Sequence, residues 1–69
     1  MNRKATNRLR VIRADRQVTQ MDLARKTGIG LSRYWRIEHG YDKPKAREVE
    51  KLAKALQVEA ADLGLAVSA

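Results

Sequence analysis

The chain has 69 residues, no cysteine and one histidine, and its 15 Lys and Arg against eight Asp and Glu give a net charge of +7. A chain of this length forms one domain with a small core. The absence of cysteine excludes disulfides and, with a single histidine, a zinc finger or zinc ribbon. No run of about 18 apolar residues is available for a membrane span, and no apolar segment follows Met1 as in a secretory signal. We therefore expect a cytoplasmic protein.

The positive charge is concentrated in the first part of the chain. Residues 1–40 carry ten basic and three acidic side chains, whereas the remainder carries five of each. A polarised excess of this kind indicates a polyanionic partner, nucleic acid before an anionic membrane. Composition alone leaves open a basic protein with no such partner.

The spacing of apolar residues predicts an all-α chain whose first helix covers residues 6–17. Leu9, Ile12 and the stem of Arg16 lie on one face of this helix at spacings of three and four residues. Thr6 is expected to cap its start. No segment alternates with the two-residue period of a strand.

A helix, a turn and a second helix are predicted within residues 20–39. Thr19, followed by Asp22 three residues later, resembles a capping box at the start of the first of these helices. Gly28 is expected to end that helix in the left-handed conformation. Ile29, which follows it between two glycines, is expected to be buried as a plug in the turn.

Two more helices are predicted over residues 45–56 and 60–63. Pro44 fits the first turn of the longer helix, and Gly64 ends the shorter one. We therefore expect a compact domain of five helices. The predicted divisions are a basic arm at 1–5, a domain at 6–64 with its helix-turn-helix at 20–39, and a tail at 65–69.

The segment from Val18 to Ile29, VTQMDLARKTGI, is similar to the second helix and turn of the lambda repressor and Cro (XRE-type) helix-turn-helix family. Glu38-His39-Gly40 is similar to that family's Glu-x-Gly ending of the third helix. The two last helices match the family at Pro44, Leu52, Ala53, Leu56, Val58 and Leu63. The resemblance covers residues 9–63 and implies the family's five-helix fold and its binding of DNA.

Three positions depart from the family pattern. Gly30 stands where the family usually caps the third helix with Ser or Thr, and Glu59 replaces the usual hydroxyl cap of the fifth helix. Glycine is an acceptable cap, only a few tenths of a kcal/mol worse than Ser or Thr. Trp35 is unusual at its position, which bears on the DNA readout rather than on the fold.

The third predicted helix, residues 31–39, has a buried side and an exposed side. An advance of about 100° per residue puts Tyr34 and Ile37 on the core side. The opposite arc faces solvent, and in this architecture it enters the major groove of DNA. That exposed arc contains Leu31, Ser32, Trp35, Arg36 and His39.

The resemblance implies base contacts at Leu31, Ser32 and Arg36, and Trp35 joins them through its place on the exposed arc. Arg36 can chelate O6 and N7 of guanine, a contact that discriminates by about 1–3 kcal/mol. Ser32 can donate or accept a hydrogen bond, whereas Leu31 can only contact a thymine methyl. Trp35 can pack on a methyl, a sugar or a neighbouring side chain. Partial burial is the alternative for Trp35. His39 is expected at the helix end, near the dipole, rather than at a base.

Four side chains are expected to contact phosphates: Gln20, Arg33, Lys43 and Lys45. The resemblance implies this contact for Gln20, which lies in a first helical turn where backbone N–H groups and the helix dipole favour an anion. Lys43 and Lys45 flank the start of the fourth predicted helix. A solvated charged face is the alternative for neighbouring basic residues such as Arg47.

The resemblance also implies an ion pair and a dimer interface. Residues at the positions of Arg13 and Glu38 pair across the first and third helices in some family members. Relatives meet through the loop between the fourth and fifth helices and through the fifth helix, which here places the interface at Val58, Leu63 and Leu65. Because one recognition helix reads only a few base pairs, we expect a homodimer on DNA. The alternative is that Leu63 is buried and the tail frays.

These features predict a sequence-specific double-stranded DNA-binding regulator of transcription, of bacterial, phage or plasmid type and associated with the nucleoid, and we favour a repressor over an activator. An adaptor or antitoxin that grips a protein through Leu31 and Trp35 is the alternative, and an anionic membrane binder is disfavoured because the first helix has no broad apolar face. No catalytic triad, carboxylate pair, Walker loop or metal cluster can be assembled from these residues. We therefore expect no enzyme activity, cofactor, metal or small-molecule ligand.

Overall fold

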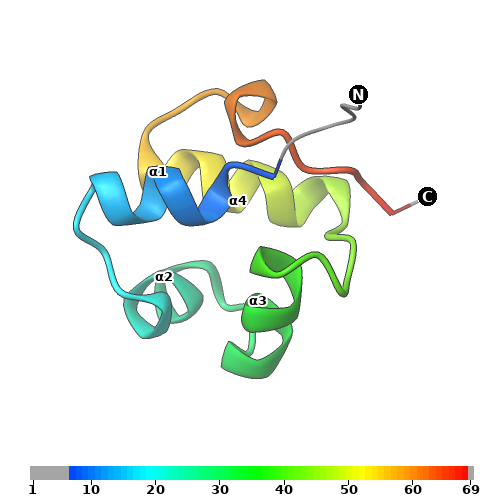
Figure 1. Ribbon diagram of the computed structural model, residues 1–69, viewed down its shortest axis with the longest axis horizontal. Helices are drawn as coiled ribbons and strands as arrows, with labels where there is room; N and C mark the ends of the chain where they lie inside the picture. Colours follow the sequence, from blue (N-terminus) through cyan, green and yellow to red (C-terminus); the bar gives the residue numbers. More distant parts are fainter. Residues whose placement is uncertain (1–6, 69) are drawn as a thin grey trace.

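The computed structural model describes residues 7–68, which form four α-helices and one 3₁₀ turn around a single core (Figure 1). The elements are α1 (Leu9–Asp15), α2 (Gln20–Thr27), α3 (Leu31–Glu38), α4 (Ala46–Leu56) and η1 (Ala60–Leu63). No strand occurs between residues 7 and 68, in agreement with the all-α prediction. None of the helices in this range is long and apolar enough to cross a membrane. The basic arm at 1–5 and the predicted cap Thr6 lie outside the described residues.

The fifth predicted helix is a single 3₁₀ turn. It has only four residues, and Gly64 ends it at a φ of 63°. The backbone N–H of Glu59 donates to Asp62 Oδ2 at 3.1 Å, so an acidic side chain caps the turn in place of a hydroxyl. The short fifth helix predicted at 60–63 is thus present as a 3₁₀ turn, and the structure has four α-helices, so a count of five α-helices is not confirmed.

The first helix is shorter than predicted at both ends. It begins at Leu9, whose backbone N–H donates to Asn7 Oδ1 at 3.0 Å. It ends at Asp15, and Gln17 then adopts a φ of 58° that reverses the chain direction. Apolar periodicity marks the buried face of a helix but not its ends, which depend on such local hydrogen bonds.

The start of α4 also differs from its prediction. Lys45 is the N-cap, with an extended backbone at φ −79° and ψ 159°, so Pro44 precedes the helix and does not occupy its first turn. Pro44 is fully buried instead. The Lys45 backbone N–H donates to Glu48 Oε1 at 2.7 Å, which satisfies a donor at the helix start.

The turn between α2 and α3 follows the sequence closely. Thr19 Oγ1 accepts a hydrogen bond from the Asp22 backbone N–H at 3.0 Å and caps α2. Gly28 ends α2 at a φ of 75°, in the left-handed region. Ile29 is buried, as expected of a plug, and its N–H donates to Ala24 O at 3.1 Å. The direction of α3 is thus set by one glycine and one apolar anchor.

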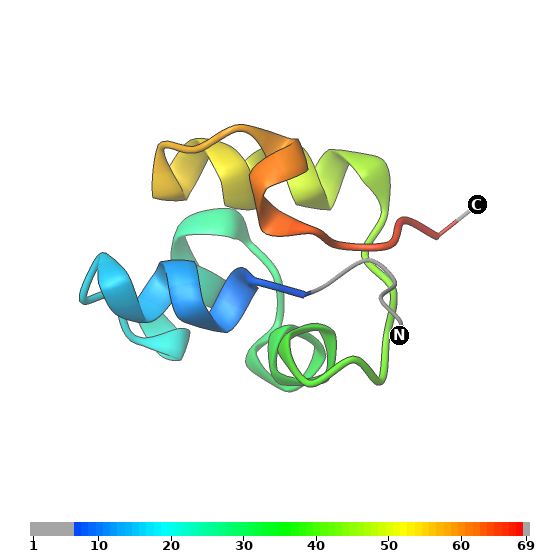
Figure 2. The same cartoon turned by 45° about the horizontal axis from the view of Figure 1, so that its top comes forward.

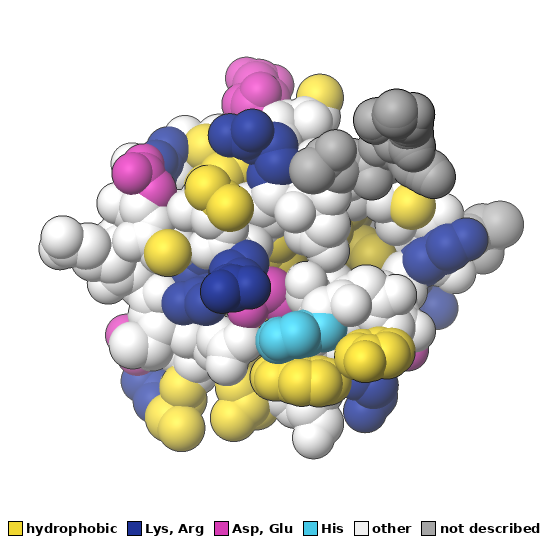
Figure 3. Space-filling model, in the orientation of Figure 1, with side chains coloured by type: hydrophobic (Ala, Val, Ile, Leu, Met, Phe, Trp, Pro, Cys, Tyr) yellow, Lys and Arg dark blue, Asp and Glu magenta, His cyan; other side chains and the backbone are white. Residues whose placement is uncertain are grey.

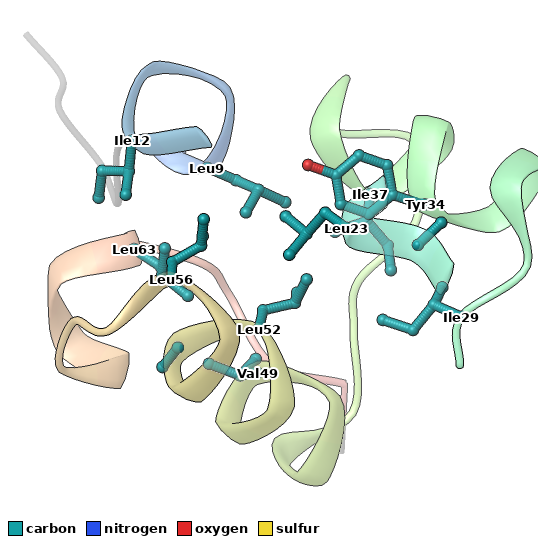
Figure 4. Packing of buried hydrophobic residues seen from close by; sticks show 12 residues of the cluster. Leu9, Ile12, Leu23, Ile29, Tyr34, Ile37, Val49, Leu52, Leu56 and Leu63 are labelled. Atoms are coloured by element: carbon teal, nitrogen blue, oxygen red, sulfur yellow. The ribbon is translucent and has the colours of Figure 1, made fainter. Parts of the chain in front are cut away.

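The core lies between α4 with η1 on one side and α1 with α3 on the other, as Figure 2 shows. Every helix and the 3₁₀ turn contribute side chains to it, and Figure 4 shows how they converge. The fully buried hydrophobic members are Leu9, Leu23, Tyr34, Ile37, Leu52, Leu56 and Leu63. Helices of seven to eleven residues are marginal in isolation, so this shared core is what holds them.

The C-terminal segment contacts the rest of the domain within the described residues. The Ser68 N–H donates to Pro44 O at 2.8 Å, which ties the segment to the loop before α4. Leu65 is partly buried against the core. The neighbouring Arg8 N–H donates to Leu63 O at 2.9 Å, so the chain beyond η1 begins from an anchored point.

Gly28 and Gly30 provide a test of the turn, because a Cβ added at either would have no other atom within 4 Å. Gly28→Ala should destabilise the domain by about 1 kcal/mol, since its φ of 75° strains any residue with a Cβ. Gly30→Ser should stabilise it by a few tenths of a kcal/mol, because the N-cap of α3 has a φ of −60° and lacks a side-chain hydrogen bond. Urea unfolding followed by circular dichroism measures both. Equal effects of the two changes would contradict this account of the turn.

Candidate nucleic-acid interface

A buried carboxylate, Glu38, joins three helices behind the exposed face of α3. Its side chain is 1% exposed. Arg13 of α1 donates from Nε to Oε2 at 2.8 Å and from Nη2 to Oε1 at 3.3 Å. Tyr34 donates its hydroxyl to Oε2 at 2.6 Å, and Gln20 of α2 donates its Nε2 to Oε1 at 2.8 Å. We call these four residues the Glu38 cluster.

The protonation states in the Glu38 cluster follow from these contacts. Burial opposes the charged form of Glu38, but hydrogen bonds from Arg13, Tyr34 and Gln20 outweigh it and hold the pKa of the carboxyl below its usual value. Burial and the neighbouring carboxylate raise the pKa of Tyr34. Glu38 is therefore ionised and Tyr34 remains a neutral donor at physiological pH. The cluster fixes α3 against α1 and α2.

The outward arc of α3 agrees with the helical-wheel prediction. Tyr34 and Ile37 are fully buried, whereas Ser32 and Arg36 are exposed. Leu31 and Trp35 are large apolar side chains that remain 44% and 43% exposed. The structure thus brings the four predicted base-contacting residues to one solvent-facing surface, which we call the recognition face.

An aromatic stack extends the recognition face beyond the end of α3. The Trp35 and His39 ring centroids lie 4.0 Å apart with planes at 20°, and the Trp35 and Tyr41 centroids lie 5.7 Å apart with planes at 9°. Figure 3 shows the single histidine bordered by hydrophobic side chains. His39 Nδ1 lies 2.9 Å from Trp35 O, so Nδ1 carries the hydrogen, because a carbonyl accepts. Tyr41 was not singled out from the sequence, where only its position after Gly40 hinted at a loop that folds back.

Arg33, expected from the sequence to contact a phosphate, has a structural role within the domain. It binds the Glu48 carboxylate of α4 with two parallel hydrogen bonds, Nε to Oε2 at 3.1 Å and Nη2 to Oε1 at 2.7 Å. Its Nη1 donates to Asp42 Oδ2 at 3.4 Å. The Arg33 guanidinium lowers the pKa of Glu48 to about 2. One hydrogen on each terminal nitrogen remains free of these contacts and the side chain is 33% exposed, so the phosphate contact predicted for Arg33 stays a prediction.

Gln20 also has a partner that its sequence position did not suggest. One Nε2 hydrogen is donated to Glu38, and the side chain is half-buried at the start of α2. An amide nitrogen has two hydrogens, so a phosphate contact uses the second. Lys43 and Lys45 are exposed at the loop and cap before α4, and neither forms an ion pair within residues 7–68.

The predicted dimer residues separate into two kinds. Leu63 is fully buried in the core, so its assignment to a dimer interface was wrong. Val58 and Leu65 are partly buried against the same core and keep some exposed surface. Val67, two residues further on, is 47% exposed.

The described residues hold no cluster of three or more side chains suited to a metal ion. What they form is two eight-residue helices, α2 and α3, joined by a turn with a left-handed glycine and a buried apolar anchor. The second of these helices turns Ser32 and Arg36, together with the apolar Leu31 and Trp35, to solvent, and the first packs against it. This arrangement defines a helix-turn-helix domain.

Comparison with known proteins agrees with this class. Residues 6–65 match the family model described as helix-turn-helix domain, and the chain belongs to that family. This confirms the family expected from the sequence. The chain is 36% identical over 58 residues to the cryptic phage CTXphi transcriptional repressor RstR of Vibrio cholerae. That alignment covers 84% of the chain and 52% of the relative, so the chain spans about half the relative's length. No solved structure matches the chain.

The Glu38 cluster makes a testable contribution to stability. Arg13→Met leaves a buried carboxylate with only neutral donors, and we expect a loss of about 3–5 kcal/mol. Adding Glu38→Gln removes the uncompensated charge and keeps an oxygen for the Tyr34 hydroxyl, so the double variant should be more stable than the single one. Thermal unfolding measures the difference, and recovered helicity reports it even where Arg13→Met is largely unfolded. A double variant less stable than Arg13→Met would show that the charge is not what matters.

Proposed function

We propose that this domain binds double-stranded DNA by placing α3 in the major groove and that it represses transcription from the site it recognises. The observation that carries this proposal is the recognition face: an exposed arc of α3, held from behind by the Glu38 cluster, in a chain of the helix-turn-helix family. The relative named as a phage transcriptional repressor supports a repressor of phage or plasmid type. The proposed role is regulatory and involves no catalysis.

The recognition face offers chemically distinct contacts to base edges. The Nη1 and Nη2 groups of Arg36 have no partner among the described residues, and two such donors match O6 and N7 of guanine. Ser32 offers one hydroxyl, while Leu31 and Trp35 offer apolar surface suited to a thymine methyl. We propose Arg36 as the main source of base discrimination.

Phosphate contacts in this proposal come from the edges of the recognition face. Lys43 and Lys45 lie in the segment that leads from α3 into α4, and both are exposed. Gln20 contributes its second amide hydrogen at the start of α2, where the helix dipole favours an anion. These contacts set affinity and register but carry no sequence information.

A protein-interaction module is a second candidate function, and the exposed aromatic stack is the observation that favours it. Trp35 and Tyr41 form a stacked apolar surface that an adaptor or antitoxin can use against a protein. The two functions differ in their dependence on salt. Binding to duplex DNA weakens steeply as salt rises, whereas an apolar protein contact does not.

The DNA-binding function predicts two different mutational signatures. Log affinity for duplex DNA should fall linearly with log salt, by about 0.9 for each phosphate neutralised. Arg36→Ala should cost about 1–3 kcal/mol on the preferred site and flatten base preference at one position. Lys43→Ala should weaken preferred and random duplexes alike. Quenching of Trp35, the only tryptophan, measures binding.

Lys54→Ala is the matched control, because Lys54 is an exposed lysine of α4 to which the proposal assigns no DNA contact. It lines a shallow hollow between α2 and α4 with Arg25, Lys26 and Lys51. Lys54→Ala should change affinity less than Lys43→Ala. A salt slope near zero on every duplex would contradict DNA binding. Equal losses from Arg36→Ala and Lys43→Ala on all sequences would instead reduce Arg36 to a phosphate contact.

We also propose that two copies pair on DNA through the partly exposed apolar residues near the C-terminal end. Val58, Leu65 and Val67 belong to the part of the chain with no net charge, so like-charge repulsion does not oppose their contact. The surface is small, which favours a dimer that forms only on DNA. Two recognition helices about 34 Å apart then read two half-sites on one face of the duplex.

Val67→Asp tests this pairing without disturbing the core, since Val67 is 47% exposed. We expect it to abolish cooperative filling of two inverted half-sites while binding to a single half-site is retained. Val11→Asp, at a position of α1 that is 61% exposed, is the matched control. Footprinting and the mass of the complex give the readout. Protection of one asymmetric half-site by a single copy would contradict the dimer.

A further inference from the structure

Asp42, in the loop between α3 and α4, binds two arginines at once. Its Oδ2 accepts a hydrogen bond from Arg36 Nε at 2.9 Å and one from Arg33 Nη1 at 3.4 Å. Arg33 is in turn held by Glu48 of α4 through two hydrogen bonds. A continuous series of ion pairs, Arg36–Asp42–Arg33–Glu48, therefore connects the recognition face to α4.

The backbone places the Asp42 carboxylate beside Arg36. Gly40 turns the chain at a φ of 83°, and the N–H groups of Tyr41 and Asp42 both donate to Arg36 O, at 2.7 and 3.2 Å. The loop thus folds back on the residue whose side chain Asp42 binds. Pro44, fully buried two residues later, anchors the other end of the loop.

The contact with Asp42 determines which N–H donors of the Arg36 guanidinium remain free to bind DNA. Asp42 takes the Nε hydrogen, and Nη1 and Nη2 have no partner among the described residues. A guanine presents two acceptors, O6 and N7, and needs two donors held in one orientation. An arginine held at Nε loses less conformational freedom on binding than a free one.

Building on the DNA-binding function proposed for α3, we propose that Asp42 is a positioning residue that makes Arg36 selective for guanine. The carboxylate holds Arg36 with its two terminal nitrogens free. It also places a negative charge beside the recognition face, which disfavours phosphate contacts made without correct base readout. Asp42 therefore increases discrimination between guanine and the other bases and lowers affinity for DNA of random sequence.

This role gives opposite effects on two measured quantities. Asp42→Ala frees Arg36 and removes a negative charge, so affinity for random duplex should hold or rise by up to about tenfold. The preference for guanine at the base pair read by Arg36 should fall by about three- to tenfold, within the range that one bidentate contact supplies. Asp42→Asn keeps a neutral acceptor, weaker than a charged one, and should give an intermediate loss of preference.

The experiment begins with selection of a preferred duplex by the wild-type chain from a random pool. The position at which Arg36→Ala loses base preference is the base pair that Arg36 reads. Duplexes with each of the three other possible base pairs at that position are then prepared. Dissociation constants are measured on these duplexes and on random duplex for the wild type, Asp42→Ala and Asp42→Asn. Glu50→Ala is the charge control, because Glu50 is exposed on α4 and forms no ion pair within the described residues.

A double-variant cycle separates positioning from general support of the loop. In an Arg36→Ala background, Asp42→Ala should leave base preference unchanged, because the side chain that Asp42 positions is absent. The Arg36 Nε–H resonance of the free wild-type chain should be protected from exchange, and Asp42→Ala should remove that protection. These two results support the proposal even where a variant loses some stability.

Two binding results overturn the proposal. In one, the Asp42→Ala substitution lowers affinity equally on every duplex. In the other, it lowers the preference for guanine equally in chains with and without Arg36. An unprotected Arg36 Nε–H in the wild type also overturns the proposal. Failure of the DNA-binding function is distinguishable from all of these. In that case the wild type shows no salt-dependent binding to any duplex, while the exchange measurement still reports whether Asp42 holds Arg36.

Discussion

The buried carboxylate of Glu38 is the constraint on which the rest of the domain depends. The helices are too short to hold their directions alone, and a charge that is 1% exposed must find donors or destabilise the fold. Arg13, Gln20 and Tyr34 supply those donors from three different helices. The requirement to satisfy one buried anion therefore sets how α3 lies against α1 and α2, and with it which arc of α3 faces outward.

Arginines and lysines have different roles in this domain. Arg13, Arg33 and Arg36 each contact a carboxylate, in geometries that suit the planar guanidinium. Lys43 and Lys45 stay exposed in the segment that leads from α3 into α4. The net charge of +7 already subtracts the carboxylates that pair with these arginines, so it gives the size of the basic excess but not where the unpaired cations lie. Local placement, rather than total charge, decides where a polyanion is attracted.

Sequence reasoning did not reveal hydrogen bonds between residues far apart in the chain, or the exact ends of helices. Gln20 and Arg33 were both assigned to phosphates, and the sequence did not indicate that each also bonds a carboxylate, 18 and 15 residues away respectively. Leu63 was assigned to a dimer interface with burial as the alternative, and η1 buries it in the core. The ends of α1 depend on Asn7 and on a left-handed Gln17, neither of which apolar spacing reveals.

The sequence by itself determined the helical class, the family, the turn and the buried side of α3. These follow from local causes. Thr19 accepts a hydrogen bond from the backbone N–H three residues later, and a glycine at position 28 adopts its positive φ without strain. Apolar spacing selects the buried face of α3. Only the tertiary structure decided which charged and polar side chains form hydrogen bonds or ion pairs within the domain. A hydrogen bond requires an approach of about 3 Å, and when its partners are far apart in sequence that approach is set by the packing of whole helices.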